Sequence, residues 1–193
     1  MIFNELVKSF KDELLIKARS MEKIRDMQKL DQPIAKLLEN TGEYVDYRNC
    51  PTNGGRWENK DGTEGKRGDS KWKPDGNYVP QKSNPEGKNW DKTMDKYGID
   101  GINFNKGEPD FSEVCKGEVT IDNFSSDRSD NFDQADKKLA EQRGCTPQDV
   151  AKWRKEHGYT WHECKDMKTM QKVPNDIHGN IPHRGGIANS KGA

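Results

Sequence analysis

The sequence has few hydrophobic residues and no long apolar run. Only 30% of its 193 residues are hydrophobic and 34% are charged, so we expect a small core for a chain of this length. It contains no stretch of about 18 apolar residues, the length that a transmembrane helix needs. Its N-terminus also lacks the basic start, apolar middle and small-residue cleavage site of a signal peptide. We therefore expect no membrane segment and no classical secretion signal.

Cysteine is scarce and irregularly spaced. No CxxC pair occurs, which argues against a structural zinc knuckle, and the spacing gives no sign of a disulfide framework. We therefore expect free thiols in a reducing compartment. The four cysteines are Cys50, Cys115, Cys145 and Cys164.

The chain has no net charge, because 33 basic residues balance 33 acidic ones. Acidic and basic residues are, however, unevenly distributed along the chain. The stretch from Glu108 to Asp136 is strongly acidic, whereas the stretch from Cys145 to Ala193 is mildly basic. Two interpretations stay open: ordinary solvated surface in both stretches, or a nucleic-acid surface beside a face that repels nucleic acid.

The pattern of residues divides the chain into an arm and a domain. Apolar residues recur at helical spacing between Phe3 and Ile24, and Pro33 ends the pattern. We interpret residues 1–42 as a helical arm or linker, for which packing onto the domain is favoured over partner binding. Residues 43–193 form the main domain, and 18 glycines and nine prolines predict that it is rich in loops.

Short strands and helices alternate along this domain, which predicts the α+β class. Between residues 44 and 105, Asp-Gly turn signals separate short strand-like segments that contain tryptophans. Residues 119–121 also have the pattern of a strand. A helix is predicted over residues 131–143, ending at Gly144, and a second one starts at Thr146-Pro147. A β-hairpin over residues 159–173 follows, and then a short helical segment.

All four histidines lie at or after position 157, and three of them belong to one run. Imidazole is the commonest metal ligand in proteins and titrates near neutral pH. A His-Glu pair followed by two further histidines therefore indicates a metal site with a base beside it. These residues are His162, Glu163, His178 and His183; we interpret the fourth histidine, His157, as structural.

This run resembles the ββα-metal core of HNH nucleases. It is most similar to HNH/endonuclease VII-type toxin modules of bacterial polymorphic toxins, which bear a Trp-His-His or Trp-His-Glu signature. The resemblance covers residues 55–187 and is most specific over the last 30 of them. Its motifs are Trp161-His162-Glu163, Met170-Gln171-Lys172-Val173-Pro174, His178 and His183-Arg184-Gly185-Gly186.

The resemblance implies a catalytic core at about residues 145–187 with one divalent ion, either Zn²⁺, Mg²⁺, Mn²⁺ or Ni²⁺. Its ligands would be His162, His178 and His183. Two registers leave the general base open: Glu163 in one, or His162 itself in the other. The family's middle Asn is replaced by Thr169, which puts one hydrogen bond of the pattern in doubt.

The resemblance also implies a substrate and partners. Arg184 would contact the scissile phosphate, and basic residues of the hairpin would hold neighbouring phosphates in a salt-sensitive manner. The expected activity is that of a metal-dependent endodeoxyribonuclease. It would act as an antibacterial effector delivered into the cytoplasm of a target cell and neutralised by a cognate immunity protein. The hairpin residues are Lys165, Lys168 and Lys172.

Two other classes of function remain open at this stage. A ribonuclease toxin could use a histidine pair on the 2′-hydroxyl of RNA and would need no metal. A non-catalytic module could use the ion only as a structural staple. The carboxylate of Glu163 beside His162 argues against the second class, because a structural site gains nothing from it. Metal dependence and activity on DNA would separate the three.

Overall fold

The computed structural model describes residue 47 and residues 49–191. The chain divides into two compact units, and all of these residues belong to the second, Val45–Ala193. The predicted helical arm over residues 1–42 lies outside the described residues. Within the described part, no helix has the length and apolar character needed to cross a bilayer.

A four-stranded antiparallel sheet forms the first half of this unit. Its strands follow the order of the sequence, and α3 (Trp90–Tyr97) is inserted between the second and third. The ring of Trp57 on the first strand lies 5.2 Å from that of Trp72 on the second, so these two tryptophans pack within the sheet. The strands are β1 (Gly55–Glu58), β2 (Lys71–Pro74), β3 (Ile102–Asn105) and β4 (Glu108–Asp110).

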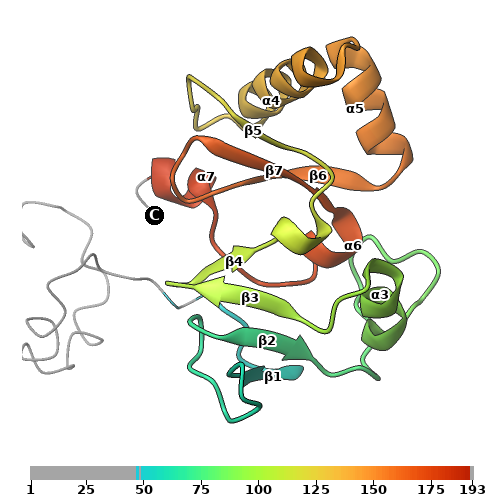
Figure 1. The fold of residues 1–193 in the computed structure, drawn as a ribbon, viewed down its shortest axis with the longest axis vertical. Coiled ribbons are helices and arrows are strands. Elements are labelled where there is room, and N and C mark those ends of the chain that lie inside the picture. The colour runs from blue at the N-terminus through green and yellow to red at the C-terminus, as the bar shows by residue number, and fades with distance from the viewer. Residues whose placement is uncertain (1–46, 48, 192–193) are drawn as a thin grey trace, which may run out of the picture. The chain divides into compact units, whose positions relative to one another are not determined.

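A three-stranded antiparallel sheet forms the second half. It has the order β5-β7-β6, with the strands β5 (Glu118–Thr120), β6 (Tyr159–Glu163) and β7 (Thr169–Pro174). Helices α4 (Arg128–Arg143) and α5 (Pro147–Glu156) lie on one side of this sheet, and the four-stranded sheet lies on the other (Figure 1). The α+β class and the C-terminal hairpin are thus confirmed. The helical elements are the 3-10 turn η2 (Ser112–Val114), α4 (Arg128–Arg143), α5 (Pro147–Glu156), α6 (Asn175–His178) and α7 (Gly186–Ser190).

The ends of α4 and α5 follow from capping residues. The Asp127 side chain accepts a hydrogen bond from the Ser129 amide, so α4 begins three residues before the predicted start. Gly144 ends α4 in the left-handed conformation, with φ of 65°. Thr146 and Asp149 form a reciprocal capping box at the start of α5. These two helices therefore return the chain to the start of β6.

Alternation along β6 gives its residues two different environments. Successive side chains of a strand point to opposite faces. Trp161 faces the helices, where its Nε1 donates a hydrogen bond of 2.7 Å to Asp136 of α4. His162 faces the other way and contacts Phe111 of the β4–η2 connection. The next residue, Glu163, faces the helices again. The alternation of side chains along β6 thus places His162 between the two sheets.

Candidate metal centre

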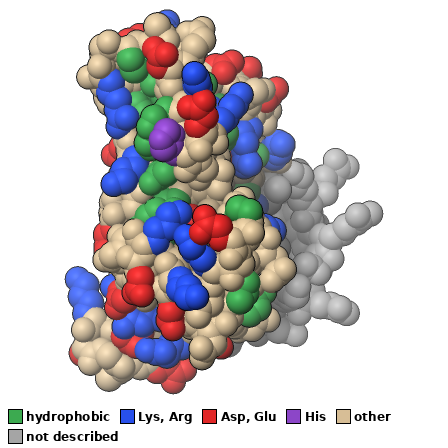
Figure 2. Space-filling model, turned by 90° about the vertical axis from the view of Figure 1, so that its right-hand side faces the viewer, with side chains coloured by type: hydrophobic (Ala, Val, Ile, Leu, Met, Phe, Trp, Pro, Cys, Tyr) green, Lys and Arg blue, Asp and Glu red, His purple; other side chains and the backbone are tan. Residues whose placement is uncertain are grey.

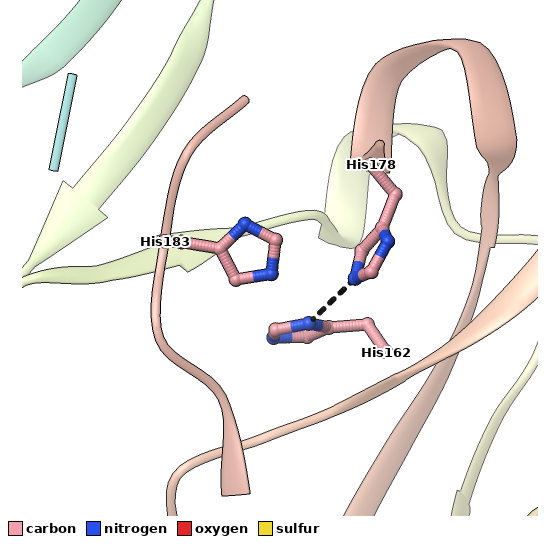
Figure 3. Close-up of side chains that lie close together, drawn as sticks. All are labelled: His162, His178 and His183. Atoms are coloured by element: carbon pink, nitrogen blue, oxygen red, sulfur yellow. Dashed lines mark hydrogen bonds between the residues drawn. The ribbon is translucent and has the colours of Figure 1, made fainter. Parts of the chain in front are cut away.

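Three histidines converge between the sheets, as Figure 3 shows. His162 lies on β6, His178 is the last residue of α6, and His183 lies in the loop before α7. The Nδ1 atom of His162 is 3.2 Å from the Nε2 atom of His178. One ligand nitrogen from each of the three rings lies within 4.8 Å of the others. The geometry brings all three predicted ligands together.

The local sequence explains how histidines five residues apart can converge. Strand β7 ends at Pro174, which is also the N-cap of the single turn of α6. His178 therefore lies one helical turn after the end of the hairpin. Pro182 then prevents the helix from continuing. The Nδ1 atom of His183 lies 2.7 Å from the carbonyl oxygen of Ile181. When Nδ1 donates this hydrogen bond, Nε2 keeps the lone pair that a metal ligand needs.

Phe111 forms the apolar wall of the cluster. Its side chain is fully buried, and its ring centroid lies 5.0, 5.6 and 5.5 Å from those of His162, His178 and His183. It comes from a part of the chain far from the histidine run. Sequence reasoning missed it, because no local pattern announces a contact at such a separation.

Burial keeps the three imidazoles neutral. It is the largest cause of a lowered pKa at each ring: well below the usual value for His162, about 3 for His178 and about 4 for His183. The charges of neighbouring histidines lower the pKa of His162 and His178 further. Neutral imidazole is the form that ligates a metal. The centre is therefore poised to accept a cation at neutral pH.

The donor set fits a divalent ion. Two nitrogens bound to one tetrahedral ion at about 2.0–2.1 Å would lie roughly 3.3 Å apart, close to the 3.2 Å between His162 and His178. Three histidines also match the number of protein ligands in catalytic zinc sites.

Glu163 is turned away from this cluster and toward α4. Its side chain is 3% exposed, and its carboxylate accepts hydrogen bonds of 3.0 Å from Asn131 Nδ2 and from Arg128 Nε. Burial raises the pKa of Glu163, and these two donors oppose the rise. Sequence reasoning missed both Asn131 and Arg128. Only the fold brings them to Glu163, although the helix that carries them was predicted in part.

Arg128 pairs with the Glu163 carboxylate, and its charge also acts on the histidines. Its side chain is 59% exposed although its Nε atom is paired with Glu163. Its positive charge contributes to the lowered pKa of all three ring systems, His162, His178 and His183. A solvent-accessible guanidinium thus lies close enough to influence the whole cluster.

The predicted phosphate contacts occupy different environments. Lys168 is exposed, and Lys165 is half-buried with its Nζ atom donating to the carbonyl oxygen of Lys106. Arg184 is half-buried directly after His183. Lys172 is only 1% exposed, and its Nζ atom lies 4.2 Å from the Trp153 ring centroid.

The prediction for Lys172 needs correction for this reason. Its side chain faces α5 within the protein, and burial lowers its pKa to about 8. A phosphate could not reach the Lys172 side chain in this structure, so we leave Lys172 out of the proposed interface.

The charged side chains on one face of the molecule are mixed. Figure 2 shows that Lys and Arg side chains are interspersed with Asp and Glu on the face drawn there. Basic residues therefore do not form a single continuous patch on that face.

His157, Asp166 and the four cysteines take no part in the three-histidine cluster. The ring of His157 stacks on Trp153 at 4.3 Å, in keeping with a structural role. Asp166 accepts hydrogen bonds from Lys168 and Thr169 within the hairpin turn. All four cysteines are free thiols.

Three neutral histidines are one of the ligand sets that catalytic zinc sites use. Residues 101–185 match a family model described as the DNase/tRNase domain of colicin-like bacteriocin. The match extends from Gly101, the residue before β3, to Gly185 and includes all three histidines. It supports a nuclease toxin domain in this part of the chain. No curated protein matches the chain.

Proposed function

We propose that this chain is a metal-dependent endonuclease that hydrolyses phosphodiester bonds of DNA. The convergence of His162, His178 and His183 is the observation that carries the proposal. These residues would hold one divalent ion through neutral nitrogens. Such an ion supplies a water nucleophile at neutral pH and stabilises the charge that develops on the phosphate.

The residues around the histidines would bind and orient the phosphate. Arg128 presents its guanidinium to solvent beside the cluster, and guanidinium matches a phosphate through paired hydrogen bonds. Glu163 would hold Arg128 in this position, and Asn131 would fix Glu163 in turn. This role differs from that of a general base, because the Glu163 carboxylate is directed toward α4.

Further basic residues would hold the neighbouring phosphates. Arg184 follows a proposed ligand directly, and Lys165 and Lys168 lie in the hairpin turn. Contacts of this kind depend on charge and carry little sequence information, so binding should weaken steeply with salt. We therefore expect cleavage that is largely independent of DNA sequence.

The chemistry of the centre favours DNA over RNA. The family description includes both DNase and tRNase domains. RNA carries a 2′-hydroxyl that can attack its own phosphate with acid–base help from histidines alone. DNA has no such nucleophile and needs an activated water. Three histidines held neutral by burial suit metal binding better than proton transfer.

The similarity to bacteriocin domains also suggests where the protein acts and which partner neutralises it. We propose that the protein acts in the cytoplasm of a target cell after delivery. A nuclease of this kind would also endanger the cell that makes it, so a cognate immunity protein is the expected partner. The acidic segment around Asp122 and Asp130 and the basic C-terminal segment are both candidate surfaces for it.

Incubation of the purified protein with supercoiled plasmid tests this function. Mg²⁺, Mn²⁺, Ni²⁺ and Zn²⁺ are added separately, with chelator as the blank and RNA as a parallel substrate. We expect metal-dependent nicking that is abolished by His162→Ala and by His178→Ala. His157→Ala is the matched control and should keep full activity, because His157 lies outside the centre.

Two results would contradict the proposal. One is an intact plasmid with every ion, in a sample that nevertheless binds metal. The other is cleavage of RNA in the presence of chelator, which would favour a metal-independent ribonuclease.

A further inference from the structure

A second group of metal-ligating side chains shares His162 with the three-histidine centre. It consists of Glu108 on β4, His162 on β6, and Cys164 immediately after β6. One ligand atom from each of these residues lies within 4.8 Å of the others. The group combines nitrogen, sulfur and carboxylate donors, whereas the first centre contains only nitrogen donors.

The fold explains why these three residues meet. His162 and Cys164 are two positions apart along an extended segment, so their side chains point to the same face. Glu108 approaches that face from the four-stranded sheet. The backbone amide of Lys165 donates a hydrogen bond to the Glu108 carboxylate, which fixes β4 against the end of β6. The donors are therefore held by both sheets.

The group contains a buried nitrogen that makes no hydrogen bond within the described residues. The Nδ1 atom of His162 contacts His178, but its Nε2 atom is buried with no hydrogen-bond partner in the part of the chain that the structure describes. An unpaired buried nitrogen beside a carboxylate and a thiol is an environment that a bound cation would complete.

We propose that Glu108, His162 and Cys164 form an inhibitory site for a thiophilic divalent ion such as Cd²⁺. The inhibition rests on the proposed nuclease function, although ion binding does not. On binding, the Cys164 thiol releases its proton to solvent and its sulfur becomes a ligand. Thiolate selects soft ions, whereas Mg²⁺ and Mn²⁺ prefer oxygen ligands.

Inhibition follows from the chemistry of imidazole. A neutral imidazole has one nitrogen with a lone pair, since the other carries the proton. His162 can therefore serve one ion at a time. An ion held with Glu108 and Cys164 withdraws His162 from His178 and His183. The first centre is then left with two of its three protein ligands.

Titration of the full chain with Co²⁺ tests the site without reference to activity. A cobalt–thiolate bond gives charge-transfer absorption in the near ultraviolet. We expect this absorption in the wild-type protein and in His178→Ala, and its loss in Cys164→Ser. Cys145→Ser is the matched control, because Cys145 is exposed and remote from the group in sequence. Absorption that persists in Cys164→Ser, or that disappears in Cys145→Ser, would overturn the proposal.

Inhibition is measured as the Cd²⁺ concentration that halves Mg²⁺- or Mn²⁺-supported plasmid nicking. Loss of one ligand should raise this concentration by about tenfold or more in Cys164→Ser and in Glu108→Gln. Circular dichroism establishes that each variant is folded. Equal Cd²⁺ sensitivity in folded Glu108→Gln, folded Cys164→Ser and the wild type would refute the inhibitory site. If no plasmid is nicked at all, the proposed nuclease fails, while the Co²⁺ titration still decides whether the ion binds.

Discussion

At the scale of single residues, two neighbours in the sequence have separate environments. His162 joins the histidine cluster, whereas Glu163 is held on the opposite face of β6 by Asn131 and Arg128. The pleat of the strand imposes this separation. A signature of adjacent His and Glu therefore does not require both side chains to act on the same atom.

This separation can be tested by paired substitutions. If Glu163 positions Arg128, then Glu163→Gln and Arg128→Ala should both reduce kcat/KM, each by the equivalent of about 1.5–3 kcal/mol for a lost charge-assisted contact. Arg128→Lys should recover only part of the loss, because lysine lacks the planar fork of arginine. The measurement is steady-state nicking kinetics at several salt concentrations.

A general base at Glu163 would give a different pattern. Glu163→Gln would then lower kcat by about 10²–10⁴-fold, as the loss of acid–base catalysis does. Arg128→Ala would leave kcat nearly unchanged. That combination would contradict the positioning role and would favour the other interpretation of the sequence.

At the scale of elements, one buried carboxylate joins two helices and a strand. Asp136 of α4 accepts hydrogen bonds from Trp161 on β6 and from Arg154 of α5. All three side chains are buried. The pair of charges is costly to desolvate, but removal of one partner leaves the other buried and uncompensated.

Substitution of this carboxylate should therefore destabilise the domain. We expect Asp136→Ala to lower the free energy of unfolding by about 3–5 kcal/mol, the usual cost of breaking a buried ion pair. Asp133→Ala on the exposed side of the same helix is the control and should change it little. Urea denaturation followed by circular dichroism measures both. A loss below about 1 kcal/mol for Asp136→Ala would place this ion pair among the weak surface ones.

The elements near the site were predictable because their signals are local. The Thr146-Pro147 start, the Gly144 end and the alternating hairpin all act within a few residues. The convergence of the histidines was predicted through the resemblance. The contacts of Phe111, Arg128 and Asn131 were not predictable, because they depend on how distant elements pack. Lys172 was misjudged for the same reason, since burial by α5 is a tertiary property.

At the scale of the whole molecule, three neutral imidazoles between two sheets should make stability depend on pH. The folded-state pKa is about 3 for His178 and about 4 for His183, against about 6.5 in an unfolded chain. At pH values between these limits the unfolded state binds more protons. The free energy of unfolding of the metal-free protein should therefore fall as the pH decreases below about 6.5.

Thermal unfolding of the metal-free protein from pH 7.5 to pH 4.5 measures this effect. The midpoint temperature of unfolding should decrease as the pH is lowered in the wild type and in His157→Gln. It should decrease less steeply in His178→Gln. Addition of a divalent ion at pH 7.5 should raise the midpoint, because the ion binds only the folded state. A midpoint that is equally acid-sensitive in His178→Gln would assign the effect to other groups.

The packing of Phe111 against all three rings links the two halves of the unit. The same apolar cluster joins Trp72 and Phe104 of the first sheet to Val173 and Ile177 of the C-terminal segment. The histidine run alone, transferred to another protein, would therefore lack part of the packing that forms this centre. Recombination that inherits the run without its partner sheet would exchange the apolar wall of the centre for solvent. The heritable module is thus larger than the motif by which it is recognised.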